Sequence, residues 1–269
     1  MSDYTHKGSC NACGSSDANA HYSDGNTHCF SCNTTVYADG SAPSEQPSKQ
    51  QKDWTVLQGE YEDLPERRLY AKTMQKFRYQ FGMTPDGTPC HIAQMHDSNG
   101  LLVAQKLRLP NKDFQWRGEA KKAGLFGQQL WESGGKRLVI TEGEIDALSY
   151  AQVTGLTWPV VSVPNGAQGA ARSIRKSLEF VESFDEVVFL FDNDEHGIAA
   201  AHECAELLTP SKAKIATLPL KDASDMFVAG RGSEVIDAIW SAKQYRPDGI
   251  VNAADLWEEV SGSNESLRV

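Results

Sequence analysis

Short apolar runs alternate with amphipathic segments through the C-terminal half of the chain. Four of these runs predict β-strands, at residues 138–141, 160–163, 186–192 and 213–218. An acidic turn and a helical stretch follow the first run, and the helical stretch 198–208 follows the third. Apolar strands that alternate with helices form parallel sheets covered on both faces. This half is therefore predicted to be an α/β domain.

Acidic residues gather where these strands end. Glu142 and Asp146 follow the first strand, Asp192 and Asp194 the third, and Asp222 the fourth. Ligands bind at the carboxyl ends of parallel strands, so we expect these five side chains at one edge of the sheet. Five carboxylates repel one another unless cations compensate them, which indicates a hard divalent metal, Mg²⁺ or Mn²⁺. Most other acidic side chains in this half are expected to lie on solvated faces of helices.

Four cysteines in two matched pairs mark a separate N-terminal unit. Cys10, Cys13, Cys29 and Cys32 have the spacing of a zinc ribbon, in which two knuckles complete a tetrahedral thiolate shell. Disulfides and a redox role are the alternatives, disfavoured because no signal peptide precedes the pairs and no strand and helix flank them. Because this short segment has few apolar side chains to bury, we expect the bound metal to supply its folding free energy.

Between the knuckles, the sequence predicts a hairpin that turns at Asp24-Gly25. Its aromatic and polar side chains could read nucleic-acid bases, or Tyr22 and Phe30 could simply form a minimal core. His28 could be a surface residue or a substitute ligand. Residues 39–53 contain two prolines and almost nothing apolar, which indicates a flexible tether. The remaining cysteines, Cys90 and Cys204, are expected to be ordinary buried thiols.

Charge changes the picture only when it is divided along the chain. The 269 residues carry a formal net charge of −10, which argues against polybasic nucleic-acid binding. Residues 51–140, however, carry 14 basic and 10 acidic side chains, whereas residues 141–269 carry 10 and 21. No apolar run reaches the roughly 18–20 residues of a membrane span, and the N-terminus does not resemble a secretory signal. A cytoplasmic location, the host cytoplasm if the protein is viral, is the expectation, with no membrane partner.

The motifs ITEGEIDAL, FLFDNDEHG and LKDASD resemble a Toprim domain, the metal-binding fold of bacterial-type primases and topoisomerases. Together with the CNAC and CFSC knuckles, AQKLRL, GLFGQQLW and RPDGIV, they resemble the primase half of the primase-helicases of T7-like bacteriophages. The resemblance covers nearly the whole chain. It implies a Toprim-type parallel sheet core with an α+β N-terminal subdomain, preceded by a small tethered zinc ribbon with four cysteine ligands. It also implies synthesis of short RNA primers on a single-stranded DNA template from ribonucleoside triphosphates.

The resemblance also assigns roles to the acids. Glu142 would be a metal ligand or a general base near the attacking hydroxyl, and Asp192 and Asp194 would hold the metal that binds the triphosphate. Asp146 and Asp222 would orient or bind a second ion. The cofactors implied are one structural Zn²⁺ and one or two Mg²⁺ or Mn²⁺ ions. Glu144 and Glu195 are expected to lie behind these ligands or to face solvent.

A basic surface is expected from residues 54–137. Arg67 matches the family's template- or nucleotide-binding arginine, whereas Arg68 stands where a glycine is usual. Lys106 and Arg108 alternate, so a strand would project both from one face, with Lys112 in the turn just beyond. These side chains can hold triphosphate and template phosphates. For Lys121 and Lys122, phosphate binding and simple exposure on a solvated face are equally good interpretations.

Other positions leave choices open. Residues 124–127 could form a lid or core, and Trp131 is expected in the core. A plain turn is favoured for Asn165-Gly166 over a close approach to nucleotide. In the ribbon, Asp24 matches the family, but Asn26 replaces the usual template-reading histidine, for which His28 is the candidate substitute.

The end of the chain predicts an amphipathic helix over 233–243 and a short helix over 253–260. In the family this region leads into a ring-forming helicase, but no P-loop motif occurs here. We therefore expect a primase fragment or a primase-only form, with a fused or separate helicase and a DNA polymerase as partners. The expected divisions are a ribbon at 1–38, a linker at 39–53, a basic subdomain at 54–137, a Toprim domain at 138–244 and a terminal segment at 245–269.

Two other functions share some of these features. A Toprim nuclease would have the acids but not the ribbon, and would cut DNA without ribonucleotides. A zinc-ribbon DNA-binding adaptor would retain the acids for structure alone. A topoisomerase is not expected, because it would need a nucleophilic tyrosine in a large DNA-gate domain, for which these 269 residues leave no room.

Overall fold

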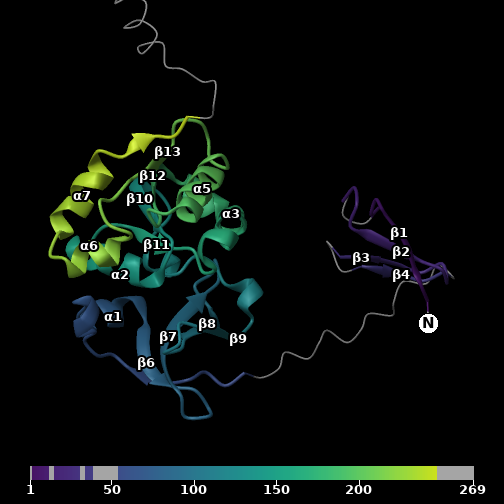
Figure 1. Ribbon diagram of the computed structural model, residues 1–269, viewed down its shortest axis with the longest axis horizontal. Helices are drawn as coiled ribbons and strands as arrows, with labels where there is room; N and C mark the ends of the chain where they lie inside the picture. The colour runs from purple at the N-terminus through teal and green to yellow at the C-terminus, as the bar shows by residue number, and fades with distance from the viewer. Residues whose placement is uncertain (1, 12–14, 31–33, 39–53, 247–269) are drawn as a thin grey trace, which may run out of the picture. The chain divides into compact units, whose positions relative to one another are not determined.

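A computed structural model describes residues 2–11, 15–30, 34–38 and 54–246 of the chain (Figure 1). It divides into two compact units, Met1–Trp54 and Thr55–Val269. The predicted basic subdomain and Toprim domain thus belong to one unit, because buried side chains of both join a single hydrophobic cluster that includes Met74, Phe77, Val139 and Val188. The predicted tether at 39–53 and helix at 253–260 lie outside the described residues.

The N-terminal unit is a four-stranded antiparallel sheet. Its strands pair in sequence order, β1 (Tyr4–Gly8), β2 (Asn19–Tyr22), β3 (Thr27–Cys29) and β4 (Thr35–Val36). The predicted hairpin is confirmed: β2 pairs with β3, and Gly25 takes a φ of 83° in the turn between them. Phe30 is 63% exposed, so it does not form a core. Among the described residues of this unit only Cys10, Ala20 and Cys29 are buried hydrophobic side chains, too few to fold the unit by burial alone.

The second unit begins with an α+β layer. An antiparallel sheet joins β5 (Gly59–Glu60), β6 (Tyr79–Met83), β7 (Pro89–His96), β8 (Leu102–Arg108) and β9 (Phe114–Gly118) in that order. With it lie η1 (Pro65–Arg67), α1 (Ala71–Phe77), η2 (Ala120–Lys122) and η3 (Gln128–Leu130). Leu125 and Phe126 are fully buried, so residues 124–127 contribute core rather than a lid. Trp131 packs against the core and donates its indole N–H to the Val160 carbonyl at 2.8 Å.

A five-stranded, mostly parallel sheet follows, as predicted. Its order is β11-β10-β12-β13-β14, with β10 (Gly135–Thr141), β11 (Val160–Ser162), β12 (Phe184–Leu190) and β13 (Ala213–Ile215) parallel and β14 (Lys243–Gln244) antiparallel. The sequence did not indicate β14. This strand begins at Lys243, the last residue of the predicted 233–243 helix, and the helix itself ends earlier, at Trp240.

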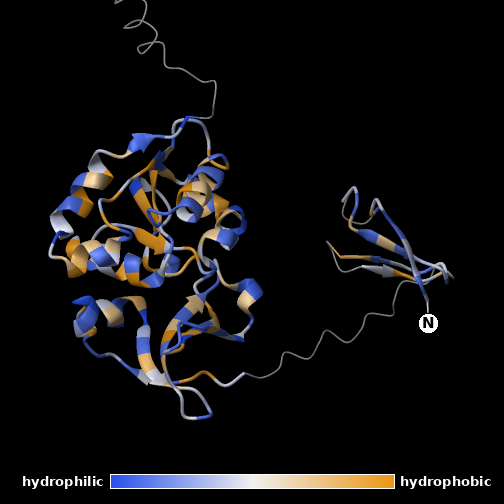
Figure 2. Ribbon diagram, viewed as in Figure 1, coloured by the Kyte–Doolittle hydropathy of each residue, from blue (hydrophilic) through white to orange (hydrophobic). Residues whose placement is uncertain are grey.

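Helices cover both faces of this sheet (Figure 1). The helices α2 (Glu144–Val153), α6 (Ala223–Val228) and α7 (Gly232–Trp240) pack together on one face, and α3 (Gly166–Lys176), α4 (Leu178–Glu182) and α5 (Glu195–Ala205) lie on the other. Successive strand residues enter different cores: Val139 and Val188 join the cluster on the α2 face, Ile140 and Val187 the cluster on the α3 face. Figure 2 shows these strands as the apolar centre of the unit. The chain crosses from one side of β10 to the other between β11 and β12, and open α/β sheets bind ligands at such a switch point.

One buried histidine gives the fold a pH dependence. His96, at the end of β7, is 3% exposed, and neither ring nitrogen has a hydrogen-bond partner in the described chain. Burial, with Arg78 nearby, lowers the pKa of its imidazole below the ordinary value. The unfolded chain therefore takes up this proton at a higher pH than the folded chain, and stability is lost as pH falls through about 6.5.

Replacing His96 with leucine is expected to remove this loss. Chemical denaturation at pH 7.5 and 5.5 should show an acid-induced fall in stability that is smaller in the variant than in the wild type by on the order of 1 kcal/mol. His91, whose pKa burial also lowers, contributes its own loss to both proteins. His202→Leu, an exposed histidine on α5, is the control and should retain the wild-type pH dependence. If His96→Leu lost as much stability between pH 7.5 and 5.5 as the wild type, the acid-induced loss would not originate at His96.

No helix in the described part of the chain combines the length and apolar character needed to cross a membrane.

Candidate active site

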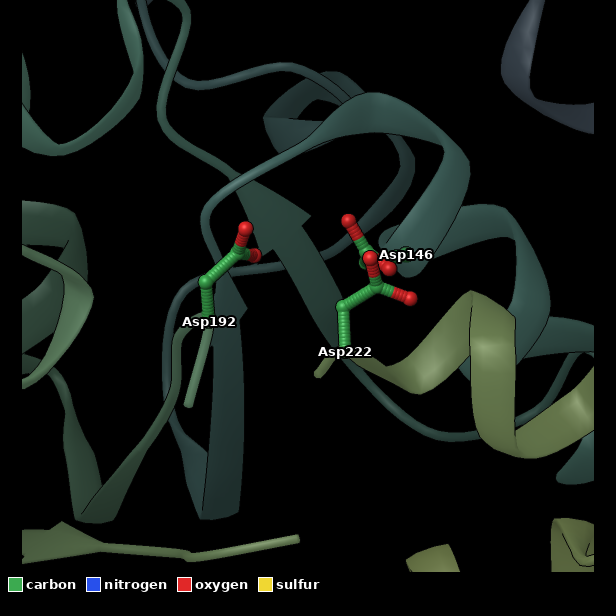
Figure 3. A group of neighbouring side chains, drawn as sticks. All are labelled: Asp146, Asp192 and Asp222. Atoms are coloured by element: carbon green, nitrogen blue, oxygen red, sulfur yellow. The ribbon is translucent and has the colours of Figure 1, made fainter. Parts of the chain in front are cut away.

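Three aspartates from three elements meet at the carboxyl edge of the parallel sheet (Figure 3). Asp192 follows β12, Asp146 lies in the first turn of α2, and Asp222 caps the N-terminus of α6. One carboxylate oxygen from each lies within 4.8 Å of those of the other two. A local cap holds Asp222, whose carboxylate accepts from the Asp225 N–H at 2.7 Å, whereas a tertiary contact holds Asp146, whose carboxylate accepts from the Ser224 N–H at 3.0 Å.

Crowding and burial oppose ionisation of this group. Burial, reinforced by the charge of Asp222, raises the pKa of Asp146 well above its usual range. The pKa of Asp192 is also raised, chiefly by burial, although Lys221 donates to it at 3.1 Å and opposes the rise. Carboxylates arranged this way are stabilised by a cation placed among them.

Glu142 joins the cavity from the end of β10. Its Oε1 accepts from the Ala167 N–H at 3.2 Å, and its Oε2 is buried with no hydrogen-bond partner in the described chain. Burial and the charge of Asp192 raise the pKa of this carboxyl. An orphaned, buried carboxylate oxygen beside three aspartates fits a metal or a proton donor as its partner.

Asn165-Gly166 turns out to be more than the plain turn favoured from sequence. The pair lines the cavity at the start of α3, and Gly166 takes a φ of 61° with Glu142 Oε1 3.5 Å from where a Cβ would stand. A side chain at this position would be strained and would approach the glutamate. The glycine therefore lets the first turn of α3 close over Glu142.

Asp194 is not brought into the cavity. Its side chain caps α5 by accepting from the Gly197 N–H at 3.0 Å, and it is absent from the residues that line the cavity. The expectation that both carboxylates of the Asp-x-Asp pair face the same way assumed extended backbone. The helix begins at Glu195, so Asp194 caps α5 as Asp222 caps α6, and its charge still raises the pKa of Glu142 and of Asp192. Its role as a metal ligand stays a prediction.

The opposite wall of the same cavity, about 600 Å³ in volume, is basic. It is lined by all four predicted cations, Arg67, Lys106, Arg108 and Lys112. Strand β8 presents Lys106 and Arg108 on the same side, as the alternation predicted. Lys112 lies in the β8–β9 turn with a φ of 66°. Lys121 and Lys122 lie outside this wall, and Lys122 pairs with Glu119 at 2.9 Å.

Lys106 is fixed by a partner that the sequence did not reveal. Its Nζ lies 2.7 Å from Glu144 Oε1, and each of these side chains is only 9% exposed. The ammonium also lies 4.4 Å from the centre of the Phe114 ring. Glu144 therefore does not face solvent: it joins the basic layer to the first turn of α2. Removing either partner would leave a buried charge unpaired.

Further polar residues complete the cavity. Arg67 donates to Ser224 Oγ at 3.2 Å and to Asp225 at 3.3 Å, and Lys221 pairs with Asp192. Hydrogen bonding to Asp192 raises the pKa of Lys221. The position of Lys221, next to Asp222 in LKDASD, was the available signal for its role.

Arg68 points away from the cavity. It takes a φ of 56°, a left-handed conformation that favours glycine, and donates to the carbonyls of Phe227 and Val228 at 3.3 and 3.4 Å. Its guanidinium thereby ties η1 to the end of α6, which places Arg67 opposite Asp225.

In the N-terminal unit, Cys10 and Cys29 are buried, and Cys13 and Cys32 lie outside the described residues. The two predicted knuckles share a backbone contact: the Cys10 N–H donates to the Ser15 carbonyl and the Cys29 N–H to that of Thr34, both at 2.8 Å. Asp24 accepts from the backbone and side-chain N–H groups of Asn26. His28 is half-buried, with Nδ1 2.8 Å from Thr35 Oγ1.

Two known protein families match the second unit, one in its α+β layer and one in its parallel-sheet layer. The family described as the N-terminal α+β fold of the bacteriophage T7 DNA helicase/primase matches residues 59–118, and the Toprim-like family matches residues 139–227. The DNA helicase/primase of Enterobacteria phage T3 is 34% identical over 262 residues. That alignment covers 93% of this chain but 46% of the T3 protein, so the chain spans about half the length of this relative.

Solved structures agree. The primase fragment of the bacteriophage T7 primase-helicase is 34% identical with a TM-score of 0.66, and the match covers 88% of this chain and all of the fragment. A second T7 structure contains lagging-strand DNA polymerase with primase domains of two subunits bound to an RNA/DNA hybrid and dTTP. It is 35% identical with a TM-score of 0.66, over 70% of this chain and 95% of the matched chain. The zinc-binding and RNA polymerase domains of the Aquifex aeolicus primase, at 16% identity and a TM-score of 0.50, share the fold; this match covers 67% of the present chain and 55% of the Aquifex chain.

Proposed function

This chain belongs to the family of the T7-like bacteriophage primase-helicases and corresponds to their primase part. We therefore propose that it is a DNA-directed RNA primase. It would join ribonucleoside triphosphates on a single-stranded DNA template during DNA replication. The observation that carries the proposal is the single cavity in which an aspartate triad faces four cations. Polyanionic triphosphate needs the cations, and nucleotidyl transfer needs the acids.

Divalent metal fits the acidic wall. Asp146, Asp192, Asp222 and Glu142 supply only oxygen donors, and the unpartnered Oε2 of Glu142 adds an acceptor that a cation would satisfy. We assign Mg²⁺ or Mn²⁺ to these residues. When bound, such ions neutralise charge that develops on the attacking and leaving oxygens.

The chain's own side chains do the positioning. Arg108 and Lys112 would bind the triphosphate, with Lys106 held in place by Glu144, and Arg67 would contact template or nucleotide. Glu142, with its raised pKa and the Ala167 N–H to orient it, would accept the proton of the attacking 3′-hydroxyl or hold a metal. Asp194 would keep the Asp192 loop and α5 in register.

We assign the N-terminal unit to template reading. The knuckle cysteines would hold one structural Zn²⁺, and Asp24 and His28 would contact template bases from the hairpin. Asn26 is held by Asp24 and accepts from the Ala38 N–H at 3.0 Å, so it presents a fixed amide at the position where the family's histidine is usual.

The partners proposed follow from the relatives. The T3 relative is a helicase/primase twice as long as the matched region, which supports a fused or separate replicative helicase as a partner. The T7 structure with lagging-strand polymerase supports primer transfer to a DNA polymerase.

A single incubation tests the proposal against its rivals. The full chain is mixed with a library of single-stranded DNA templates, Mg²⁺ and labelled ribonucleoside triphosphates, with a matched reaction lacking the triphosphates. RNA products of primer length, dependent on template and triphosphates, are expected. DNA fragments in both reactions would instead identify a nuclease, and template binding without products an adaptor.

A further inference from the structure

The exposed face of α3 is cationic in a part of the chain that is otherwise acidic. Asn165, Gln168, Arg172 and Arg175 are exposed at intervals of three and four residues, so they form one line along the helix, here called the α3 stripe. The helix contains three cations and no acid, whereas residues 141–269 as a whole carry 10 cations and 21 acids. Arg172 and Arg175 form no ion pair within the described chain.

The α3 stripe starts at the active-site cavity. Asn165 and Gly166 line that cavity, and Ala167 donates to Glu142. At 1.5 Å per residue, Arg172 and Arg175 lie about 9 and 14 Å along the helix from Gly166. A backbone advancing about 3.4 Å per base pair would cover that distance in about four base pairs.

Two lysines widen the far end of the stripe. Lys176 donates to the carbonyls of Lys121 and Ala123 at 2.8 and 2.6 Å, which holds η2 against the end of α3. Lys121 and Lys122, both exposed, therefore lie beside Arg175's end of the helix. Lys121 thus adds a cation at the end of the stripe that is far from the cavity, whereas Lys122 is paired with Glu119 at 2.9 Å.

The residue types in the α3 stripe favour paired over single-stranded nucleic acid as its ligand. Proteins that bind single strands without sequence preference combine cations with aromatic side chains on which bases stack. Helix α3 and η2 contain no aromatic residue. Arginine and amide side chains alone suit phosphates and sugars of a helix whose bases already stack on one another.

We propose that the α3 stripe binds the backbone of the short RNA–DNA hybrid as it leaves the active site. The proposal rests on the assignment of the chain as a primase and specifies where its product lies. The first few base pairs would depend on the cavity alone, and Arg172 and Arg175 would add their contacts once the hybrid reaches about four base pairs.

Binding is measured without synthesis, so that its failure is distinct from failure of the proposed activity. The double variant Arg172→Gln/Arg175→Gln is compared with the wild type for binding of a labelled eight-base-pair RNA–DNA hybrid across a salt series. Affinity at low salt should fall roughly 10-fold or more, and the slope of log affinity against log salt should decrease by about 2, because each arginine would neutralise one phosphate. Single-stranded DNA of the same length should bind the variant almost as well as it binds the wild type.

The matched control is Lys72→Gln/Lys243→Gln, which removes two exposed cations from α1 and β14. It should keep the wild-type affinity and salt slope. Hybrid binding by the α3 variant equal to that of this control would overturn the proposal. Equal reductions in affinity for hybrid and single strand would also overturn it, by assigning the stripe to the unpaired template.

Discussion

Replacing Asp192 with asparagine is expected to reduce dinucleotide synthesis by at least about 10²–10³-fold, the usual cost of losing one group that stabilises transition-state charge. Asp192 is the member of the triad that follows β12, and it faces both Asp146 and Asp222 (Figure 3). Asparagine keeps the shape but not the charge, so metal held by the triad would be bound weakly.

The loss should not come from unfolding. Burial already raises the pKa of Asp192, so a neutral side chain relieves repulsion when metal is chelated. The pair with Lys221 is removed, but that lysine is largely exposed and such a pair contributes at most about 1 kcal/mol. Thermal unfolding in excess chelator should therefore give a midpoint at or slightly above that of the wild type.

Two further substitutions sharpen the test. Asp194→Asn should lose less activity than Asp192→Asn, because asparagine caps a helix as well as aspartate does. Asp237→Asn, an exposed acid on α7, should keep the wild-type rate. Near-normal dinucleotide synthesis by Asp192→Asn would show that the metal assignment is wrong.

The sequence predicted those parts of the site that depend on short-range pattern. Strand-terminal acids such as Glu142 and Asp192 could be placed because apolar runs mark the strands, and parallel strands bring their ends together. The alternation of Lys106 and Arg108 was likewise enough to place both on one wall.

What could not be predicted depends on tertiary contacts and on backbone conformation. The Lys106–Glu144 pair joins residues 38 positions apart, and no local pattern indicates it. Asp194 belongs to the same motif as Asp192, yet the start of α5 turns it into a cap. Arg68 has a left-handed backbone conformation, and its side chain donates to two carbonyls at the end of α6 that offset the strain. The presence of an arginine where glycine is usual does not by itself indicate these contacts.

Replacing Cys29 with serine is expected to impair initiation on a template more than extension of a preformed primer. Cys29 is fully buried in a unit whose described residues include almost no apolar core, so the loss of one of four proposed thiolates would remove the zinc and the free energy that folds the unit. The residues from Thr55 onward form their own compact unit and should retain a separate unfolding transition. Under the proposed function, extension would use the cavity of that unit, whereas initiation would also require the proposed template contacts of the hairpin.

The measurement is therefore a ratio, taken together with zinc content. Initiation should fall at least roughly 10-fold relative to extension, in line with losses seen when metal sites are perturbed, and bound zinc should fall from one per chain towards none. Cys90→Ala is the control, because Cys90 is a buried thiol of the second unit without a partner at metal spacing. It should keep both the zinc and the ratio even if it lowers the unfolding midpoint. Equal losses of initiation and extension in Cys29→Ser would mean that the N-terminal unit contributes stability alone, and that template reading belongs to the basic wall that Arg67 lines.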